Sequence, residues 1–227
     1  MFWLSTLFEE LDVLIRSTDT DILAIAMINH SELYLHQRNV VIHYGNSSAD
    51  FTHCHLNRLL ELSQQDHKLS LLQTRGLPIP RLLGALHFIT GCDDLSYLRG
   101  FTKNFCMKVY TKYCDLICGE SLEGCQSLFT GDVDSVKSFF TKLLICLYCD
   151  KYSQCFSSGD EKELCWQSGD EKTLGIIREK TWHKTIVTNN QLPTTTAIRL
   201  HSERISLVLE FNAGATQSEI FNTDHTS

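Results

Sequence analysis

Two pairs of aspartates are the residues of this sequence best suited to chemistry. Asp19 and Asp21 lie in the segment STDTD, directly after the short apolar run LDVLI at 11–15, and Asp93 and Asp94 are adjacent in TGCDD. Carboxylates one residue apart at the end of a strand can hold a hard cation such as Mg²⁺, or they can cap the helix that follows. The spacing of Asp19 and Asp21 alone leaves both interpretations open.

Basic residues follow the second aspartate pair. Arg99, Lys103, Lys108 and Lys112 flank or follow Gly100 in the segment RGFTKNFCMKVYTK. A glycine turn between two helices presents backbone amides to phosphate oxygens, and lysines neutralise the phosphate charge, so this segment predicts a grip on a nucleic-acid backbone. The alternative is the exposed face of an ordinary helix, because the formal net charge is −7 and any such contact has to be local.

The ten cysteines raise the question of a zinc site. Cys146 and Cys149 form a CxxC pair, and His53–His55 adds further candidate ligands in the tripeptide His-Cys-His. The pair lies in SFFTKLLICLYCDKY, which is typical of an amphipathic helix with both thiols at its apolar side. We expect reduced, buried thiols there, with structural zinc as the alternative because finger-like spacing is met only in part. His87, in an apolar helical run, is expected to pack against its neighbours.

The first half of the chain alternates between strand-like and helix-like segments, and the second half is mostly helical. The pattern predicts strands over 11–15, 32–37, 40–45 and 51–55, and helices over 22–30, 56–63, 78–90, 101–118, 133–151 and 197–211. A polar connection that contains SGDEK twice, at 158–162 and 168–172, lies between the last two helices.

This alternation predicts an α/β fold with a parallel sheet flanked by helices, because parallel strands need crossover connections. Ligands of such sheets bind at the carboxyl ends of the strands, where Asp19 and Asp21 stand. We expect a first domain over 1–118, a helical region over 119–212 and a polar, disordered tail over 213–227.

The composition is that of a globular protein, with 227 residues, 43% hydrophobic and 21% charged. No basic segment precedes the first apolar run, and no apolar run approaches the roughly 18 residues that span a bilayer. We therefore expect an intracellular protein, nuclear or cytoplasmic, without a membrane partner.

The motifs in their order resemble the 5′-nuclease superfamily, the flap-endonuclease-like branch of PIN-type folds. The segment STDTD after an apolar strand is followed about seventy residues later by TGCDDLSYLRGFTK. The chain is also similar to a group of animal proteins thought to derive from mobile elements, which share an LPxLHxxTGCD-type motif and a late LPxTxxAxxxH helix. These motifs stand here as LLGALH at 82–87 through Asp93, and as LPT at 192–194 through His201.

The resemblance implies a PIN-like parallel sheet with a helix-hairpin-helix at Gly100 and two-metal chemistry on branched or single-stranded DNA. Asp19, Asp21 and Asp93 would then be catalytic residues and ligands of Mg²⁺ or Mn²⁺. The residues that would bind nucleic acid are Arg99, Gly100, Lys103 and Lys108.

Two departures from the superfamily limit what the resemblance implies. The superfamily takes further acids from a strand and a helix well upstream of its Asp-x-Asp, whereas only eighteen residues precede Asp19. Thr102 stands where a second glycine usually allows close approach of the backbone. The chain is therefore expected to lack the front half of the nuclease domain. We expect a metal-dependent nuclease-like protein of weak or no activity, or a non-catalytic remnant that binds nucleic acid or protein.

Overall fold

The computed structural model describes most of the chain. The described residues are 13–19, 21–29, 39–44, 52–67, 69–70, 79–92, 95, 97–118, 127–156, 171–186 and 190–214. The predicted strand over 32–37, the duplicated SGDEK segments up to residue 170 and the tail beyond Gly214 lie outside them.

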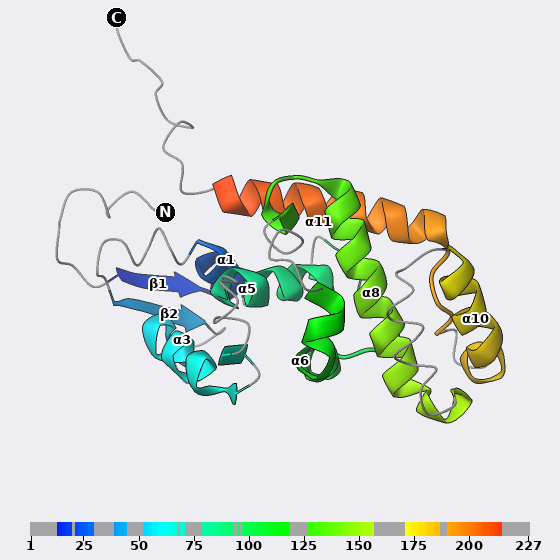
Figure 1. Cartoon of the computed structure of the whole chain (residues 1–227). Coiled ribbons are helices and arrows are strands. Elements are labelled where there is room, and N and C mark those ends of the chain that lie inside the picture. The colour runs from blue at the N-terminus through cyan, green and yellow to red at the C-terminus, as the bar shows by residue number, and fades with distance from the viewer. Residues whose placement is uncertain are drawn as a thin grey trace, which may run out of the picture.

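A small sheet occupies one end of the molecule (Figure 1). Its strands are β1 (Val13–Ser17), β2 (Val40–Tyr44) and β3 (Thr52–His55), in the order β1-β2-β3. The strands β1 and β2 pair in parallel, but β2 and β3 pair antiparallel. The predicted parallel sheet is thus confirmed only for β1 and β2; β3 pairs antiparallel, because residues 45–51 are too few for the crossover that parallel strands require.

Two helices pack against one face of this sheet and bury its apolar side chains. They are α1 (Asp21–Ile28) and α3 (Leu56–Gln65). Ala26 and Met27 of α1 and Leu56 of α3 are buried in one cluster with Val40 and Ile42 of β2. The alternation along β2 therefore turns Val40 and Ile42 inward, and Val41 and His43 to the other face.

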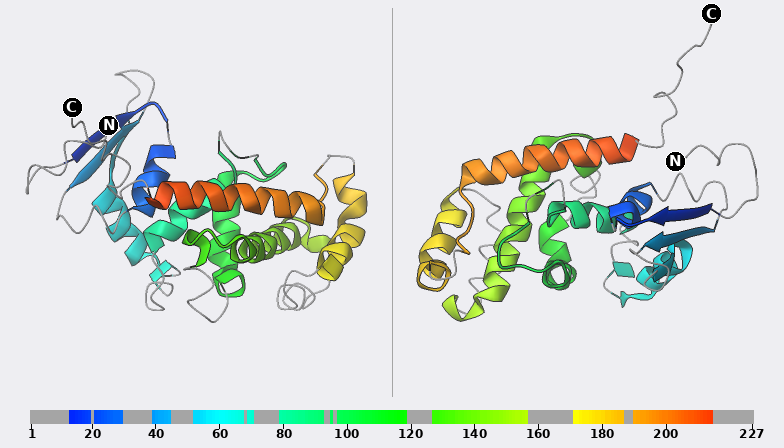
Figure 2. Two further views of the ribbon diagram at one scale, coloured as in Figure 1. Left: turned by 90° about the horizontal axis from the view of Figure 1, so that it is seen from above. Right: turned by 180° about the vertical axis from the view of Figure 1, so that it is seen from behind.

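Among the described residues, five further helices build the larger, helical part of the molecule. They are α5 (Ile79–Ile89), α6 (Lys103–Cys118), α8 (Val133–Lys151), α10 (Glu171–Thr185) and α11 (Thr195–Gly214), with short 3-10 turns at Ser127–Phe129 and Ser153–Cys155. The helix α11 lies across α8 and extends along α5 toward α1, as Figure 2 shows from two further sides.

One hydrophobic core joins these helices. It includes Ile28 of α1, Leu86 of α5, Tyr110 of α6, Leu144 of α8 and Ile205 of α11. The core thus continues across residue 118, where a domain boundary was predicted, and that boundary stays a prediction. The class of the fold is confirmed as α/β with a mostly helical content.

The helices predicted from the sequence are present, with small shifts of their ends. α8 has the predicted bounds because the Asp132 side chain accepts from the Asp134 amide and caps it. α10 was not predicted, and its residues from 171 onward had been assigned to the polar connection. Leu174 and Ile177 of α10 are buried in the core, and this packing stabilises a helix of polar composition.

No helix among the described residues is long and apolar enough to cross a bilayer.

Candidate functional site

The two aspartates after β1 have different roles in the structure. Asp19 is exposed, and its Oδ1 accepts a hydrogen bond of 2.9 Å from the backbone amide of Asp21 at the start of α1. The amide of Asp19 in turn donates to the hydroxyl of Ser17 over 3.0 Å. Asp19 therefore stabilises the turn that begins the helix, as the capping interpretation predicted. The carboxylate of Asp21 is left for another partner.

That partner is His87 of α5. Its Nε2 lies 2.5 Å from Oδ1 of Asp21, and the two side chains are only 22% and 15% exposed. Close packing of α1 on α5 brings them together, because a Cβ at Gly84 would lie 2.6 Å from the carbonyl oxygen of Ala24. A largely buried carboxylate needs such a partner, since burial without one is costly.

Lys103, in the first turn of α6, completes the group. Its Nζ lies 3.1 Å from Nδ1 and 2.9 Å from Nε2 of His87. Because Nε2 donates its hydrogen to Asp21, Nδ1 is the ring nitrogen that can accept from the ammonium group. We name these three residues the Asp21–His87–Lys103 group. It places a carboxylate, an imidazole and an ammonium group in contact with one another.

A pocket of about 320 Å³ adjoins this group between α1, α5 and α6. Its walls are mostly apolar and include Leu23, Met27 and Met107, while His87 and Lys103 supply polar atoms at one side. The group therefore borders a hollow rather than lying flat on the surface. An imidazole and an ammonium group beside an apolar pocket can bind and orient an anionic group.

The segment between α5 and α6 ends in the glycine turn predicted from the sequence. The amide of Phe101 donates to the carbonyl of Leu98 over 3.1 Å, and Gly100 has φ of +77°, a conformation that favours glycine. Nζ of Lys151 donates to the carbonyl oxygen of Gly100 over 2.6 Å. A Cβ at Gly100 would also lie 2.6 Å from Nδ2 of Asn190. The turn is thus braced from α8 and from the segment before α11.

Thr102, which stands in place of a second glycine, caps α6. Its Oγ1 accepts a hydrogen bond of 3.2 Å from the amide of Phe105, and its carbonyl accepts from Cys106. This is the role that threonine commonly has at the start of a helix. Thr102 therefore has a structural role at the beginning of α6.

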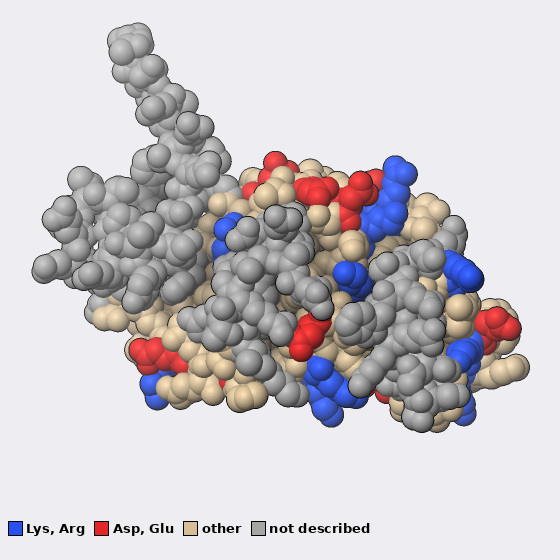
Figure 3. Space-filling model, viewed as in Figure 1, with Lys and Arg blue, Asp and Glu red and all other residues tan. Residues whose placement is uncertain are grey.

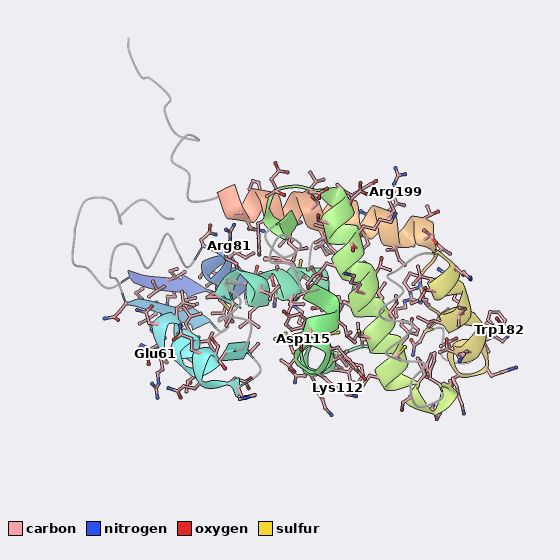
Figure 4. All side chains as sticks on the ribbon, in the orientation of Figure 1. Glu61, Arg81, Lys112, Asp115, Trp182 and Arg199 are labelled. Atoms are coloured by element: carbon pink, nitrogen blue, oxygen red, sulfur yellow. The ribbon has the colours of Figure 1, made fainter. Side chains whose placement is uncertain are left out.

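The predicted cations near the turn differ in their contacts. Arg99 and Lys108 are exposed, and within the described part of the chain neither forms an ion pair. Lys112 instead lies 2.5 Å from Oδ1 of Asp150 on α8, and this hydrogen bond raises the pKa of the Lys112 ammonium group. Figure 4 shows Lys112 on α6 at the edge of the molecule. Arg99 and Lys108 are the cations available for a ligand, and Lys112 is held by α8.

The third predicted metal ligand, Asp93, lies outside the described residues, as does Asp94. Among the residues that are described, no three His, Cys, Asp or Glu side chains converge as metal ligands do. Asp19 is engaged in its turn, and Asp21 is bonded to His87 with the Lys103 ammonium group nearby. Mg²⁺ and Mn²⁺ require several oxygen ligands, so the described residues do not by themselves fit either ion.

The zinc candidates are separated by the geometry of their elements. Cys54 pairs with Ile42 and packs on the sheet face that α1 and α3 cover, whereas His53 and His55 alternate to the other face. Cys146 and Cys149 are buried in α8, as predicted. None of the eight described cysteines forms a disulfide bond.

Sequence reasoning missed two arrangements of histidines. The sequence predicts a packing role for His87, whereas the structure places it between Asp21 and Lys103. On the face of the sheet opposite α1 and α3, Nδ1 of His53 lies 2.6 Å from Nε2 of His43. Burial, followed by the charges of His53, Arg16 and His55, lowers the pKa of His43. The strand alternation of VVIHY and THCH was the signal that could have paired His43 with His53.

Comparison of the chain with known protein families, with curated proteins and with solved structures finds no match in any of the three.

Proposed function

We propose that this chain is a nuclease-like protein that binds nucleic acid at the Gly100 turn and the beginning of α6, with phosphodiester hydrolysis weak or absent. One observation carries the proposal. Segments that are far apart in the sequence meet in the Asp21–His87–Lys103 group, directly beside the turn that presents Arg99. These segments are the same ones on which the resemblance to the 5′-nuclease superfamily rests.

In this proposal, α5, the Gly100 turn and α6 form the helix-hairpin-helix of a PIN-like fold. The turn would hold Arg99 at the phosphate backbone, because Lys151 and Asn190 fix its conformation. A guanidinium group matches two phosphate oxygens at once, and Lys108 on the exposed side of α6 would neutralise a second phosphate.

The role of the Asp21–His87–Lys103 group would be to hold an ammonium group in one position beside the turn. The Asp21 carboxylate fixes the His87 ring, and the ring fixes Lys103. Binding would remain local, since basic and acidic side chains alternate in small groups on the described surface seen in Figure 3. We therefore expect only a few phosphate contacts and, for that reason, a shallow dependence of affinity on salt.

Fluorescence anisotropy with labelled single-stranded, duplex and branched DNA tests this proposal. Arg99→Gln and Lys108→Gln should each weaken binding of all sequences and lower the slope of log affinity against log salt by about 1. Lys172→Gln, which removes the same charge from the exposed surface of α10, is the matched control. Absence of binding at low salt, or equal affinities for all four proteins, would contradict the proposal.

Metal-dependent hydrolysis is the second candidate. The position of Asp19 and Asp21 at the carboxyl end of β1 favours it, with Asp93 as the further ligand and Mg²⁺ or Mn²⁺ as the ion. Incubation of the same DNAs with either ion measures it. Cleavage by the wild-type chain that is lost in Asp93→Ala and in Asp21→Asn would establish this candidate and exclude the non-catalytic role. A role in protein binding stays a prediction.

A further inference from the structure

A second pocket lies on the helical part of the molecule, away from the Asp21–His87–Lys103 group. Its volume is about 350 Å³, and it lies between the Gly100 turn, α8 and the first half of α11. The turn belongs to the RGFTK segment, and the first turns of α11 belong to the segment LPTTTAIRLH at 192–201. Two of the unusual sequence motifs therefore line one pocket, although about ninety residues separate them along the chain.

The inner part of this pocket is apolar. Phe140 and Leu144 of α8 and Ile198 of α11 are buried at 1% exposure each and line it. Phe101 and Tyr148 add aromatic rings whose centroids lie 5.1 Å apart. The hydroxyl of Tyr148 already donates to the carbonyl of Asn190 over 2.9 Å. A ligand in the pocket would therefore contact the ring of Tyr148 and not its hydroxyl. Such a surface favours a planar or branched apolar group.

The outer part of the pocket carries positive charge. Arg99 from the turn and Arg204 from α11 both line it, both are exposed, and within the described chain neither has an ion-pair partner. The described lining residues include no aspartate or glutamate. Two guanidinium groups without a carboxylate partner among the described residues therefore meet at one opening, in a protein with a formal net charge of −7. They complement a single anionic group.

We propose that this pocket binds a small amphiphilic anion, with its apolar body on Phe140, Leu144 and Ile198 and its carboxylate, sulfonate or phosphate between Arg99 and Arg204. The volume is at the lower end of the range for small-molecule sites, which suits a ligand of one or two rings or a short acyl chain. Arg99 borders both this pocket and the proposed nucleic-acid surface. Arg204 belongs to this pocket alone, and it separates the two proposals.

A pair of fluorescent probes tests the proposal on the full chain. The anion 8-anilinonaphthalene-1-sulfonate should bind saturably with one-to-one stoichiometry, and N-phenyl-1-naphthylamine has the same rings without the charge. Arg204→Gln should lower the affinity for the anionic probe by about twofold to fivefold, because an exposed charge pair contributes modestly to binding. The affinity for the neutral probe should stay unchanged. Ala197→Trp, which fills the pocket from α11, should abolish binding of both probes.

Arg199→Gln is the matched control. It lies on the same helix and is exposed, but it pairs with Glu203 and does not line this pocket, and Figure 4 shows it pointing outward from α11. Equal effects of Arg199→Gln and Arg204→Gln on the anion would overturn the proposal. So would binding of several probe molecules per chain, or unchanged binding in Ala197→Trp.

A second readout does not depend on the stability of the variants. His201 lines the pocket, whereas His53 lies on the sheet. Addition of the anionic probe to the wild-type chain should shift the ring resonances of His201 in NMR spectra and leave those of His53 in place. Shifts of both rings, or of neither, would show that the anion binds elsewhere. The expected shift of the His201 resonances does not depend on whether the chain binds DNA.

Discussion

Neighbouring residues of one type have unlike roles when the backbone turns between them. Asp19 faces solvent and caps the start of α1, while Asp21 faces α5 and bonds to His87. The sequence predicted that this aspartate pair follows a strand. It could not predict the partner, because His87 is brought to Asp21 by the packing of two helices and not by any local pattern.

Replacement of His87 by Phe should destabilise the protein. The ring of similar size leaves the 15% exposed carboxylate of Asp21 without its donor, at an expected cost of about 1–3 kcal/mol in the free energy of unfolding. Urea denaturation measures this cost. His87→Gln, which keeps a donor, should lose less, and His183→Phe on the exposed side of α10 should change little. Equal stabilities of His87→Phe and His183→Phe would show that the Asp21 contact contributes nothing.

His201 should make the stability of the protein depend on pH. Burial lowers its pKa below the ordinary 6.5, the hydrogen bond to the carbonyl of Ile89 opposes this shift, and the charge of Arg204 adds to it. Because the unfolded chain then takes up the proton first as the pH falls, the stabilisation is complete above pH 6.5 and is lost as the pH falls through the lowered pKa of the folded state.

The comparison of wild type with His201→Phe isolates this effect, since Phe keeps the ring against Phe140, whose centroid lies 4.8 Å away. The loss of unfolding free energy between about pH 7.5 and about pH 5.5 should be smaller in His201→Phe than in wild type. An identical loss in both proteins would exclude His201 as its source.

At the scale of elements, helices whose beginnings carry a side-chain cap were predicted with nearly correct bounds. Asp132 caps α8, Thr102 caps α6, and Thr194 accepts from the amide of Ala197 at the start of α11. These contacts are local, so the sequence contains them. The antiparallel pairing of β3 is not local, and the prediction of a parallel sheet was wrong for that strand.

The missing prediction of α10 has a specific cause. Thr173, Ile177, Thr181 and Thr185 recur at four-residue spacing, and all are buried at 2% exposure or less. The hydroxyls of Thr181 and Thr185 each donate to the carbonyl four residues earlier, which allows threonine to occupy the inner side of a helix. The segment was judged by its polarity, whereas its spacing was the informative signal.

Two substitutions of glycine by alanine inside helices should change the stability of the protein in opposite directions. In Gly84→Ala the new Cβ would lie 2.6 Å from the Ala24 carbonyl oxygen and 2.8 Å from Cγ1 of Ile28, which forces α1 away from α5. We expect a loss of about 1–3 kcal/mol in unfolding free energy. In Gly175→Ala nothing lies within 4 Å of the new Cβ, and we expect a gain of about 0.5–1 kcal/mol.

Thermal and urea denaturation of the two variants check this contrast. Each variant is the control of the other, because both place alanine at a glycine inside a helix. A gain of stability in Gly84→Ala would show that α1 and α5 do not pack as closely as the structure has them.

At the scale of the whole molecule, α11 connects parts of the chain that lie far apart in sequence. It packs on α8, α5 and α1. At its end, Nδ2 of Asn29 donates to the backbone carbonyl of Asn212 over 2.8 Å and to that of Ile25 over 3.0 Å. Asn29 is 4% exposed, so these hydrogen bonds are shielded from water.

Asn29→Ala should therefore destabilise the protein as a whole. Two carbonyls lose a buried donor, and we expect a decrease of about 1–3 kcal/mol in unfolding free energy without a change in the denaturant slope. Asn104→Ala on the exposed side of α6 is the control and should be nearly neutral. A stability of Asn29→Ala equal to that of Asn104→Ala would show that the contact between α1 and α11 is not stabilising.

The contact between Asn29 and Asn212 also has a consequence for the order in which the protein folds. It joins residues that are 183 positions apart, so the side chain of Asn29 cannot reach this acceptor until Asn212 has left the ribosome. Contacts of such high sequence separation slow folding, because the loop must close before the contact forms. The sheet and α5 can cover most of the buried side of α1 early in synthesis, whereas the end of α1 at Asn29 is covered only when α11 has been made.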